Sequence, residues 1–535
     1  MHLSATEIPD GARLDADVCV VGAGPAGIAV ALELDARNLD VVLIEQGTAD
    51  LRGEVHGVYP ALEDTRAGGF GGSAALWDAE LADHMHGARH GRLSPSDFEP
   101  REGAEWSGWP FDAAELDSWY DRAAEICELV PAPAGTANPR GRLVDHVLGF
   151  SPASTFLETH RRRLVASRRV RVIEPATALS LSVDENRVAH ALEVSTAPGQ
   201  RIAVHARTFV LALGGIENAR FLLLNDLGNE HDLVGRFFMD HPTAHCRLSA
   251  EPASDLAPYD VQVRAGRTVA IRALGLADDT RTGSGLGNSA MFIVPRLDRD
   301  ERVVSAASQL LGRSRTNSAR MGVLVRRVAL APDVLLFESY RRLSRRIPAL
   351  AVADRVSARA RLRNTLAVGT TSGWSQLRRT PTAFEVHHAF EQFPDYERRI
   401  TLGERRDSLG RPLPKLGFFI SDAEIASLER TQEIIRAELR DLGVGTLSTT
   451  RDLVAPHDIR ESIHPSAHHH LGTTRMHVDP RRGVVDADGR LHAGRNIYVT
   501  GGSVFPTGGY VNPTLTIVAL AARLGVHLAD RLEGA

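Results

Sequence analysis

The N-terminal part of the chain alternates short apolar runs with glycine-rich turns. Residues 17–21 form a β-branched run that leads through a turn at 22–27 into residues 28–34, whose length and apolar pattern are those of a helix. A second apolar run covers residues 41–44. Short β-branched runs on either side of a helical segment are typical of alternating strands and helices. The pattern therefore predicts a βαβ unit at the start of the chain.

Two later parts of the chain extend this unit. Residues 208–215 form an apolar run that ends in glycine and precedes a helical pattern at 216–224, so we interpret the run as a returning strand. Residues 496–500 predict another strand, and a final helix is expected from Asn512 onward. Pro513 fits the first helical position, because its missing N–H costs nothing there.

The middle of the chain, about residues 250–460, has separate strand and helix patterns and contains no internal repeat. The length of 535 residues exceeds what one hydrophobic core usually supports. We therefore expect two domains.

The first glycine-rich turn carries a candidate cofactor motif. Gly22, Gly24 and Gly27 form the pattern GxGxxG between the predicted strand and helix, and Glu45 lies 23 residues beyond Gly22. Such glycines let the backbone approach a pyrophosphate at the helix N-terminus, and an acid at this distance can accept hydrogen bonds from a ribose. This context predicts a dinucleotide site. The alternative is a tight turn with a purely structural role.

A second glycine-rich stretch, residues 66–77, contains Gly71, Gly72 and Ser73. It has too many glycines for a core helix and suits a backbone that passes close to a cofactor.

Composition excludes several classes of protein. The formal net charge of -5 argues against a general affinity for nucleic acid. No apolar stretch is long enough for a membrane span, and residues 1–14 lack a signal sequence, so we expect a cytoplasmic protein. Cys19, Cys127 and Cys246 are scattered without metal-ligand spacing, which argues against disulfides and a zinc site.

Residues 301–365 are rich in arginine. They contain fourteen arginines and four acids, with apolar stretches between them. A basic amphipathic pattern can meet a membrane surface or a partner subunit. We favour the other interpretation, a helical flap with solvated arginines, because Lys415 is the only lysine in the chain and arginine is abundant throughout.

Two short blocks near the end of the chain are the most informative. Residues 468–476 read HHHLGTTRM, and residues 501–507 read GGSVFPT and are followed by YVNPTLT at 510–516. Together with the GxGxxG turn, Glu45 and the GGS segment, these blocks resemble the glucose-methanol-choline (GMC) flavin oxidoreductases. The closest likeness is to the sugar-oxidising branch that contains pyranose oxidases and bacterial glycoside 3-oxidases. Residues 234–242 and 391–394 are also similar to family stretches.

The resemblance implies an α/β fold. An FAD-binding Rossmann-like domain would be joined to a substrate domain built on a mostly antiparallel sheet. We expect the FAD-binding domain at 1–85, 151–249 and 464–535, a connecting lid at 86–150, and the substrate domain at 250–463 with the 301–365 insertion.

The resemblance also implies the site residues. The catalytic histidine of the family matches His469, and a second catalytic position, filled by His or Asn, matches Asn512. Alternation in an extended segment would point the neighbouring His468 and His470 the other way. Three consecutive histidines can also form a metal site or an exposed loop. Adjacent residues of a strand converge poorly on one ion, so we expect no metal. Asn512 can also be a helix cap.

These residue types fit alcohol oxidation. A neutral imidazole can take the hydroxyl proton near neutral pH, and the amide of Asn512 can hold the same oxygen while hydride passes to the flavin. Further cofactor contacts are expected from Gly501, Gly502, Pro513 and Thr514. The N-terminus of the helix that begins near Pro513 would favour negative charge on the reduced flavin.

Two departures from the family affect the cofactor. Leu76 occupies the position at which covalent pyranose oxidases carry a flavin-linked histidine, so we expect a dissociable FAD. Gly501 stands where many members have an aspartate, and the glycine pair 501–502 is shared with the sugar branch.

The sequence thus predicts FAD-dependent oxidation of a secondary hydroxyl of a sugar, glycoside or related polyol, with oxygen or a quinone as electron acceptor. Alternatives are a flavin lyase without net redox change, oxidation of a non-sugar alcohol, and a binding protein with structural FAD. A nicotinamide-linked flavoprotein would require a second GxGxxG, which is absent. Substrate, reacting carbon and oligomeric state stay open.

Overall fold

The structure is a computed structural model, and all elements below belong to the residues that it describes. These are 2–47, 51–76, 88–101, 103–130, 141–152, 154–252, 254, 256–259, 262–264, 267–295, 383–455 and 457–534. The arginine-rich segment 301–365 lies outside the described residues.

The first of two large sheets has eight strands and is mainly parallel. Its order is β1-β7-β3-β2-β10-β9-β8, with β19 beside β10. Neighbouring strands from β1 through β10 pair in parallel, and β19 is also parallel to β10. The pairs β10–β9 and β9–β8 are antiparallel. The strands are β1 (His2–Ser4), β2 (Arg13–Val21), β3 (Val41–Ile44), β7 (Val170–Glu174), β8 (Thr177–Val183), β9 (Ala189–Ala197), β10 (Gln200–Leu211) and β19 (Ile497–Val499).

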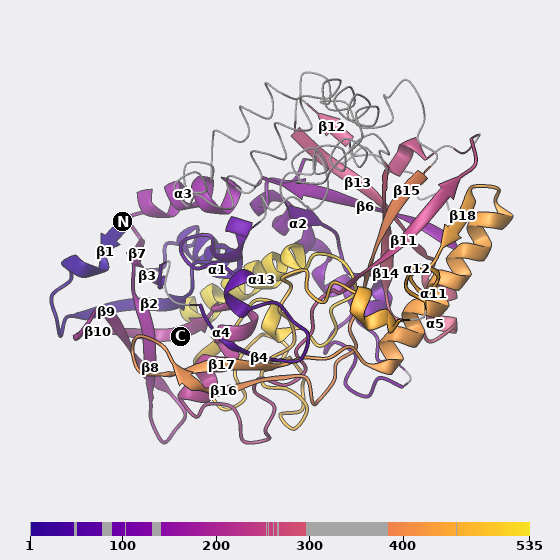
Figure 1. Cartoon of the computed structure of the whole chain (residues 1–535). Helices are drawn as coiled ribbons and strands as arrows, with labels where there is room; N and C mark the ends of the chain where they lie inside the picture. The colour runs from indigo at the N-terminus through magenta and orange to yellow at the C-terminus, as the bar shows by residue number, and fades with distance from the viewer. Residues whose placement is uncertain are drawn as a thin grey trace, which may run out of the picture.

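Helices cover this sheet and close its core. Helix α1 (Pro25–Asp35) packs on α13 (Thr514–Glu533), which also contacts α2 (Asp117–Ile126), and the two longer helices lie side by side in Figure 1. Helix α1 is buried nearly all round, and every residue of β3 is buried. A strand covered on both faces reads as a continuous apolar run, which explains the pattern at 41–44. The other helices here are α3 (His160–Ala166) and α4 (Gly214–Leu224).

The second large sheet is antiparallel throughout. Its order is β18-β11-β15-β14-β13-β6-β5, with β12 on β13. The strands are β5 (Ala88–His90), β6 (Leu143–Ser151), β11 (Thr243–Ala250), β12 (Gln262–Arg264), β13 (Arg267–Leu276), β14 (Ser289–Pro295), β15 (Ala383–Phe390) and β18 (Gly445–Ser448). The helices beside it are α5 (Asp278–Gly283), α11 (Asp422–Asp441) and α12 (Thr450–Val454).

Helix α11 begins with a capping box. The Ser421 hydroxyl accepts from the backbone N–H of Glu424, and the Glu424 carboxylate accepts from the Ser421 N–H. A third, small sheet joins β16 (Arg399–Arg406), β17 (Pro412–Gly417) and β4 (Glu54–His56), and α4 packs on its first two strands.

The predicted α/β class, with a flavin-type first sheet and an antiparallel second sheet, is confirmed. Two predicted boundaries differ from the sheets. Strand β6 falls in the predicted lid 86–150, and β11 begins within the predicted segment 151–249, yet both belong to the second sheet. The final helix begins at Thr514, two residues after Asn512, and the carbonyl of Pro513 accepts its first hydrogen bond.

All three cysteines are buried and unpaired. Among the helices that the structure describes, none combines the length and apolar character needed to cross a membrane. The cytoplasmic location stays a prediction.

Candidate active site

A cavity of about 560 Å³ lies where the two large sheets meet. The first unit contributes the glycine turn after β2 and the start of α13, and the second sheet contributes residues of β5, β11 and β15. Nine of the predicted cofactor positions line it: Gly22, Gly24, Glu45, Gly72, Ser73, Gly501, Gly502, Pro513 and Thr514. The predicted catalytic pair, His469 and Asn512, lines the same cavity.

The three glycines of the turn have different surroundings. Gly22 has a φ of 105°, and a Cβ there would lie 2.4 Å from the Ala212 carbonyl oxygen. A Cβ on Gly27 would lie 1.8 Å from the carbonyl oxygen of Gly22, so Gly27 packs the turn and does not line the cavity. A Cβ on Gly24 would meet nothing within 4 Å. Gly24 therefore leaves open space on the cavity side.

The carboxylate of Glu45, which was expected to accept hydrogen bonds from a ribose, has backbone partners in the structure. Its carboxylate accepts hydrogen bonds from the backbone N–H groups of Ala23 at 2.8 Å and of Gly47 and Gly69 at 3.1 Å. Burial raises the pKa of Glu45, and these three donors oppose the rise. The carboxylate therefore fixes both glycine-rich turns, and a ribose could use only its remaining lone pairs.

The GGS segment forms a short 3₁₀ turn, Gly72–Leu76. Gly71 does not line the cavity: its N–H bonds the Ala23 carbonyl at 2.8 Å, and a Cβ there would lie 2.4 Å from the Leu157 side chain. Gly71 therefore packs this turn, and its expected role at the cofactor stays a prediction. Leu76 lines the cavity.

The two C-terminal blocks run beside each other. The N–H of Gly472 bonds the Gly502 carbonyl at 3.1 Å, and the N–H of Thr474 bonds the Ser503 carbonyl at 2.8 Å. This pairing brings His469 and the segment before α13 to one end of the cavity.

His469 lies between two polar side chains. Its Nδ1 is 2.9 Å from Nδ1 of His241, and its Nε2 is 3.0 Å from Nδ2 of Asn512. The amide nitrogen can only donate, so Nε2 accepts and the imidazole proton is on Nδ1, from which it is donated to His241. We assign this tautomer from the hydrogen bonds. The lone pair on Nε2 is therefore the basic position of the site.

Asp240 holds the backbone around His469. Its Oδ1 accepts from the backbone N–H groups of His241, Ala467 and His469 at 2.7–3.0 Å. Its Oδ2 accepts from the hydroxyls of Tyr59 and Ser466 at 2.6 Å. Burial alone would raise the pKa of Asp240, but the nearby histidines and these hydroxyls outweigh it and lower the pKa. Asp240 is therefore an ionised anchor.

His469 and His241 are neutral near pH 7. Burial lowers the pKa of His469 well below 6.5, and His241 lowers it further. Burial also lowers the pKa of His241. Because the folded pKa lies below the ordinary value, His469 remains able to accept a proton until the pH falls well under 6.5.

The expected alternation around His469 is wrong. His468 has a φ of 65°, so the segment is not an extended strand, and all three histidines line the cavity. His470 packs against Phe238 and Tyr59. The expected cap role of Asn512 is also not observed, because its side chain contacts His469 and no side chain caps α13.

Sequence reasoning missed His241 and Asp240. Both residues lie in the 234–242 stretch that resembles the family, and the adjacent Asp-His pair in that stretch was the sequence signal that could have identified them. The structure shows that both side chains are buried.

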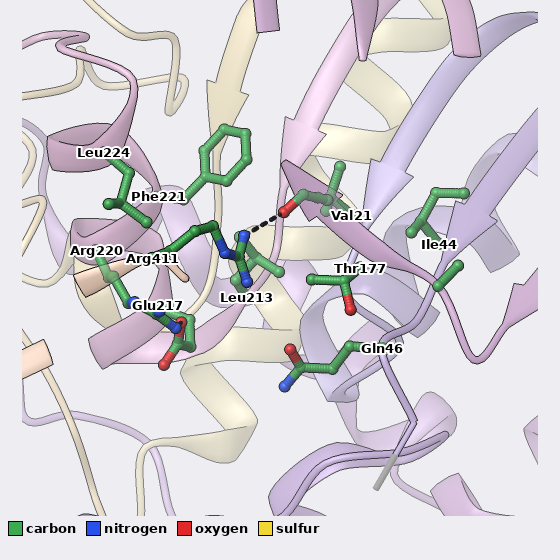
Figure 2. A pocket seen from close by; sticks show the side chains of 12 residues that line it. Val21, Ile44, Gln46, Thr177, Leu213, Glu217, Arg220, Phe221, Leu224 and Arg411 are labelled. Atoms are coloured by element: carbon green, nitrogen blue, oxygen red, sulfur yellow. Dashed lines mark hydrogen bonds and ion pairs between the residues drawn. The ribbon is translucent and has the colours of Figure 1, made fainter. Parts of the chain in front are cut away.

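A second cavity of about 30 Å³ lies at the ends of β2 and β3, beside Val21 and Ile44 (Figure 2). Arg411 closes one side by donating to the Ala178 carbonyl at 2.9 Å, and Glu217 lines both cavities. A space of this size holds one or two waters and no substrate.

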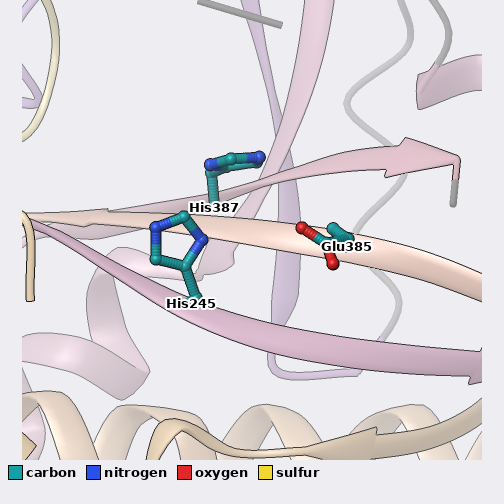
Figure 3. A group of neighbouring side chains, drawn as sticks. All are labelled: His245, Glu385 and His387. Carbon is teal, nitrogen blue, oxygen red and sulfur yellow. The ribbon is translucent and has the colours of Figure 1, made fainter. Parts of the chain in front are cut away.

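Three side chains on the second sheet have the spacing of metal ligands. His245 lies directly opposite His387, and Glu385 lies two residues before His387 on the same face of β15 (Figure 3). Their ligand atoms all lie within 4.8 Å of one another. His468, His469 and His470 are not part of this group. The absence of a metal stays a prediction.

Two protein-family models match the chain. Residues 17–280 match the model described as FAD dependent oxidoreductase, and residues 394–521 match the model described as GMC oxidoreductase. The first match contains the glycine turn and Glu45, and the second contains His469 and Asn512.

Known proteins are similar over different lengths. Paromamine 6'-oxidase of Streptomyces fradiae is 24% identical over 548 aligned residues, which cover 96% of this chain and 92% of that protein. C-glycoside 3-oxidase of Microbacterium trichothecenolyticum is 33% identical over 129 residues, which cover 24% of this chain and 23% of that protein.

The fold is similar to that of a solved formate oxidase, with 15% identity, a TM-score of 0.52, and coverage of 98% of this chain and 100% of that chain. The glycine-rich and C-terminal motifs, the cavity that they line and both family matches all indicate a flavin oxidoreductase. The chain therefore combines an FAD dependent oxidoreductase domain at 17–280 with a GMC oxidoreductase C-terminal domain at 394–521, and it is an FAD-dependent CH–OH oxidoreductase.

Proposed function

We propose that this enzyme oxidises a secondary hydroxyl of a sugar, glycoside or related polyol to a ketone, and that it belongs to the sugar-oxidising branch of the family. The observation that carries the proposal is the row His241, His469 and Asn512 in the same cavity as the glycine turn. The names of the relatives support it, because they describe oxidases of glycosidic compounds. These names favour oxidation over a lyase reaction.

The cavity fits FAD. The open side of Gly24 gives room for a pyrophosphate at the N-terminus of α1, where free N–H groups favour anions. Gly72, Ser73, Gly501, Gly502, Pro513 and Thr514 line the remainder. When bound, FAD accepts the hydride from the substrate carbon. Leu76 offers no nucleophile for a covalent bond, so the FAD is dissociable.

His469 is the proposed base. The hydroxyl of the substrate enters between Nε2 of His469 and the amide of Asn512, donating to the first and accepting from the second. The proton then moves to Nε2 while the proton on Nδ1 stays shared with His241. The alkoxide that develops is held by the Asn512 amide, which orients the carbon-bound hydrogen. The electron acceptor that reoxidises the enzyme is oxygen or a quinone.

The first prediction tests the function itself. A panel of sugars and glycosides is mixed anaerobically with the enzyme, and we expect at least one to bleach the flavin absorbance. Subsequent mixing with oxygen or a quinone then identifies the acceptor. If every sugar and glycoside leaves the flavin oxidised while a simple alcohol reduces it, the substrate class is wrong.

The second prediction separates the roles of two glycines. Gly27→Ala should prevent stable folding, because its Cβ would overlap the Gly22 carbonyl. Gly24→Ala should fold normally but retain little FAD, because its methyl group would project into the space for the pyrophosphate. Thermal melting of the apoprotein and flavin content measure the two effects.

A dissociable cofactor should be released by acid. Flavin should appear in the supernatant after acid precipitation of the wild type, and flavin on the pellet would contradict a dissociable cofactor.

The third prediction concerns the base. His469→Ala should slow flavin reduction by about a hundredfold or more with FAD still bound. His468→Ala is the matched control and should lose far less, because its ring makes no hydrogen bond with the rest of the described chain. For the wild type, the rate should stay constant from pH 8 down through about 6.5 and fall only at lower pH, since His469 has a lowered pKa. Equal losses in both variants would exclude the single-base mechanism.

The fourth prediction concerns Asn512. Asn512→Ala removes the donor to the alkoxide, whereas Asn512→Asp also places a carboxylate beside Nε2, which favours the protonated imidazole and raises the pKa of His469. The aspartate variant should therefore be the slower of the two near pH 7, with its acid limb moved to higher pH. Both should melt like the wild type, as the side chain makes no cap. Faster flavin reduction by Asn512→Asp than by Asn512→Ala would assign Asn512 a structural role.

A further inference from the structure

One face of the second sheet forms a wall of the cavity. Arg89 of β5 lies over the ring of Phe292, with Cζ 4.1 Å from the ring centroid. Phe292 of β14 is directly opposite His387 of β15, which is opposite His245 of β11. Arg89, His387 and His245 line the cavity. The wall thus begins with a cation and continues with two imidazoles.

Arg89 has no anionic partner in the described part of the chain. No described carboxylate forms an ion pair with it, and its Nε is buried without a hydrogen-bond partner. Burial lowers the pKa of Arg89 to about 10, which still leaves it charged near pH 7. Arg89 is partly buried and lines the cavity, and a charge in such surroundings without a partner is costly. Its usual resolution is an ion of opposite sign.

The acids that line the described part of the cavity do not balance this charge. Glu45 and Glu217 are the two acids among the described lining residues. Glu45 accepts three backbone N–H groups, and Glu217 pairs with Arg66 at 2.7 Å and Arg220 at 3.1 Å. Among the described lining residues, Arg89 therefore carries a positive charge that no acid balances.

That charge lies near the catalytic pair. Arg89 lines the same cavity as His469 and Asn512, and just beyond β5 a Cβ on Gly91 would lie 3.0 Å from the side chain of Val511, which precedes Asn512. In agreement with this, Arg89 is among the charges that lower the pKa of His469, after burial as the largest cause. A group bound at Arg89 would therefore be close to the hydroxyl bound between His469 and Asn512.

Resting on the proposed function, we propose that Arg89 binds a carboxylate of the substrate, so that the enzyme acts on a sugar acid or a glycoside of a sugar acid. The planar guanidinium matches a carboxylate with paired hydrogen bonds. A single arginine balances one negative charge, which fits a carboxylate better than a doubly charged phosphate. An ammonium-bearing sugar would be repelled.

The neighbouring imidazoles fit hydroxyl groups. Burial lowers the pKa of His387 to about 4, so it is neutral and can donate to or accept from a sugar hydroxyl. A metal ion on His245, Glu385 and His387 (Figure 3) would place a second cation near Arg89, which opposes its binding. The charge distribution thus favours a carboxylate at this wall.

The test uses two probes that differ only at C6, methyl β-D-glucopyranoside and methyl β-D-glucopyranosiduronate. Binding is measured from the perturbed flavin absorbance, and kcat/KM from anaerobic flavin reduction. In the wild type we expect the glucuronide to bind and react about tenfold or more better than the glucoside. Arg89→Gln should reduce binding of the glucuronide by about 30- to 100-fold and change the glucoside by less than about threefold. Arg89→Lys should restore part of the loss.

Arg92→Gln is the matched control. Arg92 follows the same strand but pairs with Asp117 and Asp121 on the exposed surface, so this variant should behave like the wild type. A wild type that binds the glucuronide no better than the glucoside overturns the inference. So does an Arg89→Gln variant with equal losses for both probes and a shifted flavin potential, which would place Arg89 on the cofactor.

The two proposals fail differently. If neither probe reduces the flavin, but the glucuronide binds and its binding is lost in Arg89→Gln, the carboxylate site stands and the proposed oxidation of these sugars fails. If the glucoside is oxidised and the glucuronide does not bind, the oxidation stands and the carboxylate site fails.

Discussion

The active site depends on one buried carboxylate. Asp240 receives five hydrogen bonds, three from backbone N–H groups and two from hydroxyls, and it stands where the chain passes from the flavin unit into β11. Its own N–H is held by Gln392 at 2.9 Å. Loss of the carboxylate would leave several buried donors without a partner, each at a cost of about 1–3 kcal/mol. The geometry of His469 is therefore fixed by a side chain that lines no part of the cavity.

Electrostatics at the site follow from burial. His469 and His470 lose their tendency to ionise because burial lowers the pKa of both, and Asp240 keeps its charge because donors surround it. A base that is neutral and prearranged need not release a proton before it accepts one. In the same surroundings of low polarity, an unbalanced charge in the wall interacts strongly with a charged ligand. Arg89 therefore contributes to selectivity for the charge of a ligand.

Strong local patterns were predictable, and contacts between distant segments were not. Strand β3 has the predicted bounds 41–44, and the helix at 216–224 is part of α4. The start of α13 and the conformation of His468 depend on hydrogen bonds and on a left-handed backbone that no residue type signals. His241 bonds His469 across 228 positions, and Arg89 belongs to no motif. Glu45 was identified from its spacing, but the three backbone N–H groups that donate to its carboxylate are brought together only by the folded turns.

The packing of α13 on α1 has a consequence for the order of events during synthesis. Helix α1 is translated long before α13, which packs on it, and long before His469 and Asn512. Until then the face of α1 that packs on α13 stays uncovered, although its other face can already pack on β2 and β3. Capture of the cofactor must therefore follow completion of residues 464–533, and a nascent chain would need protection of α1 throughout most of its translation.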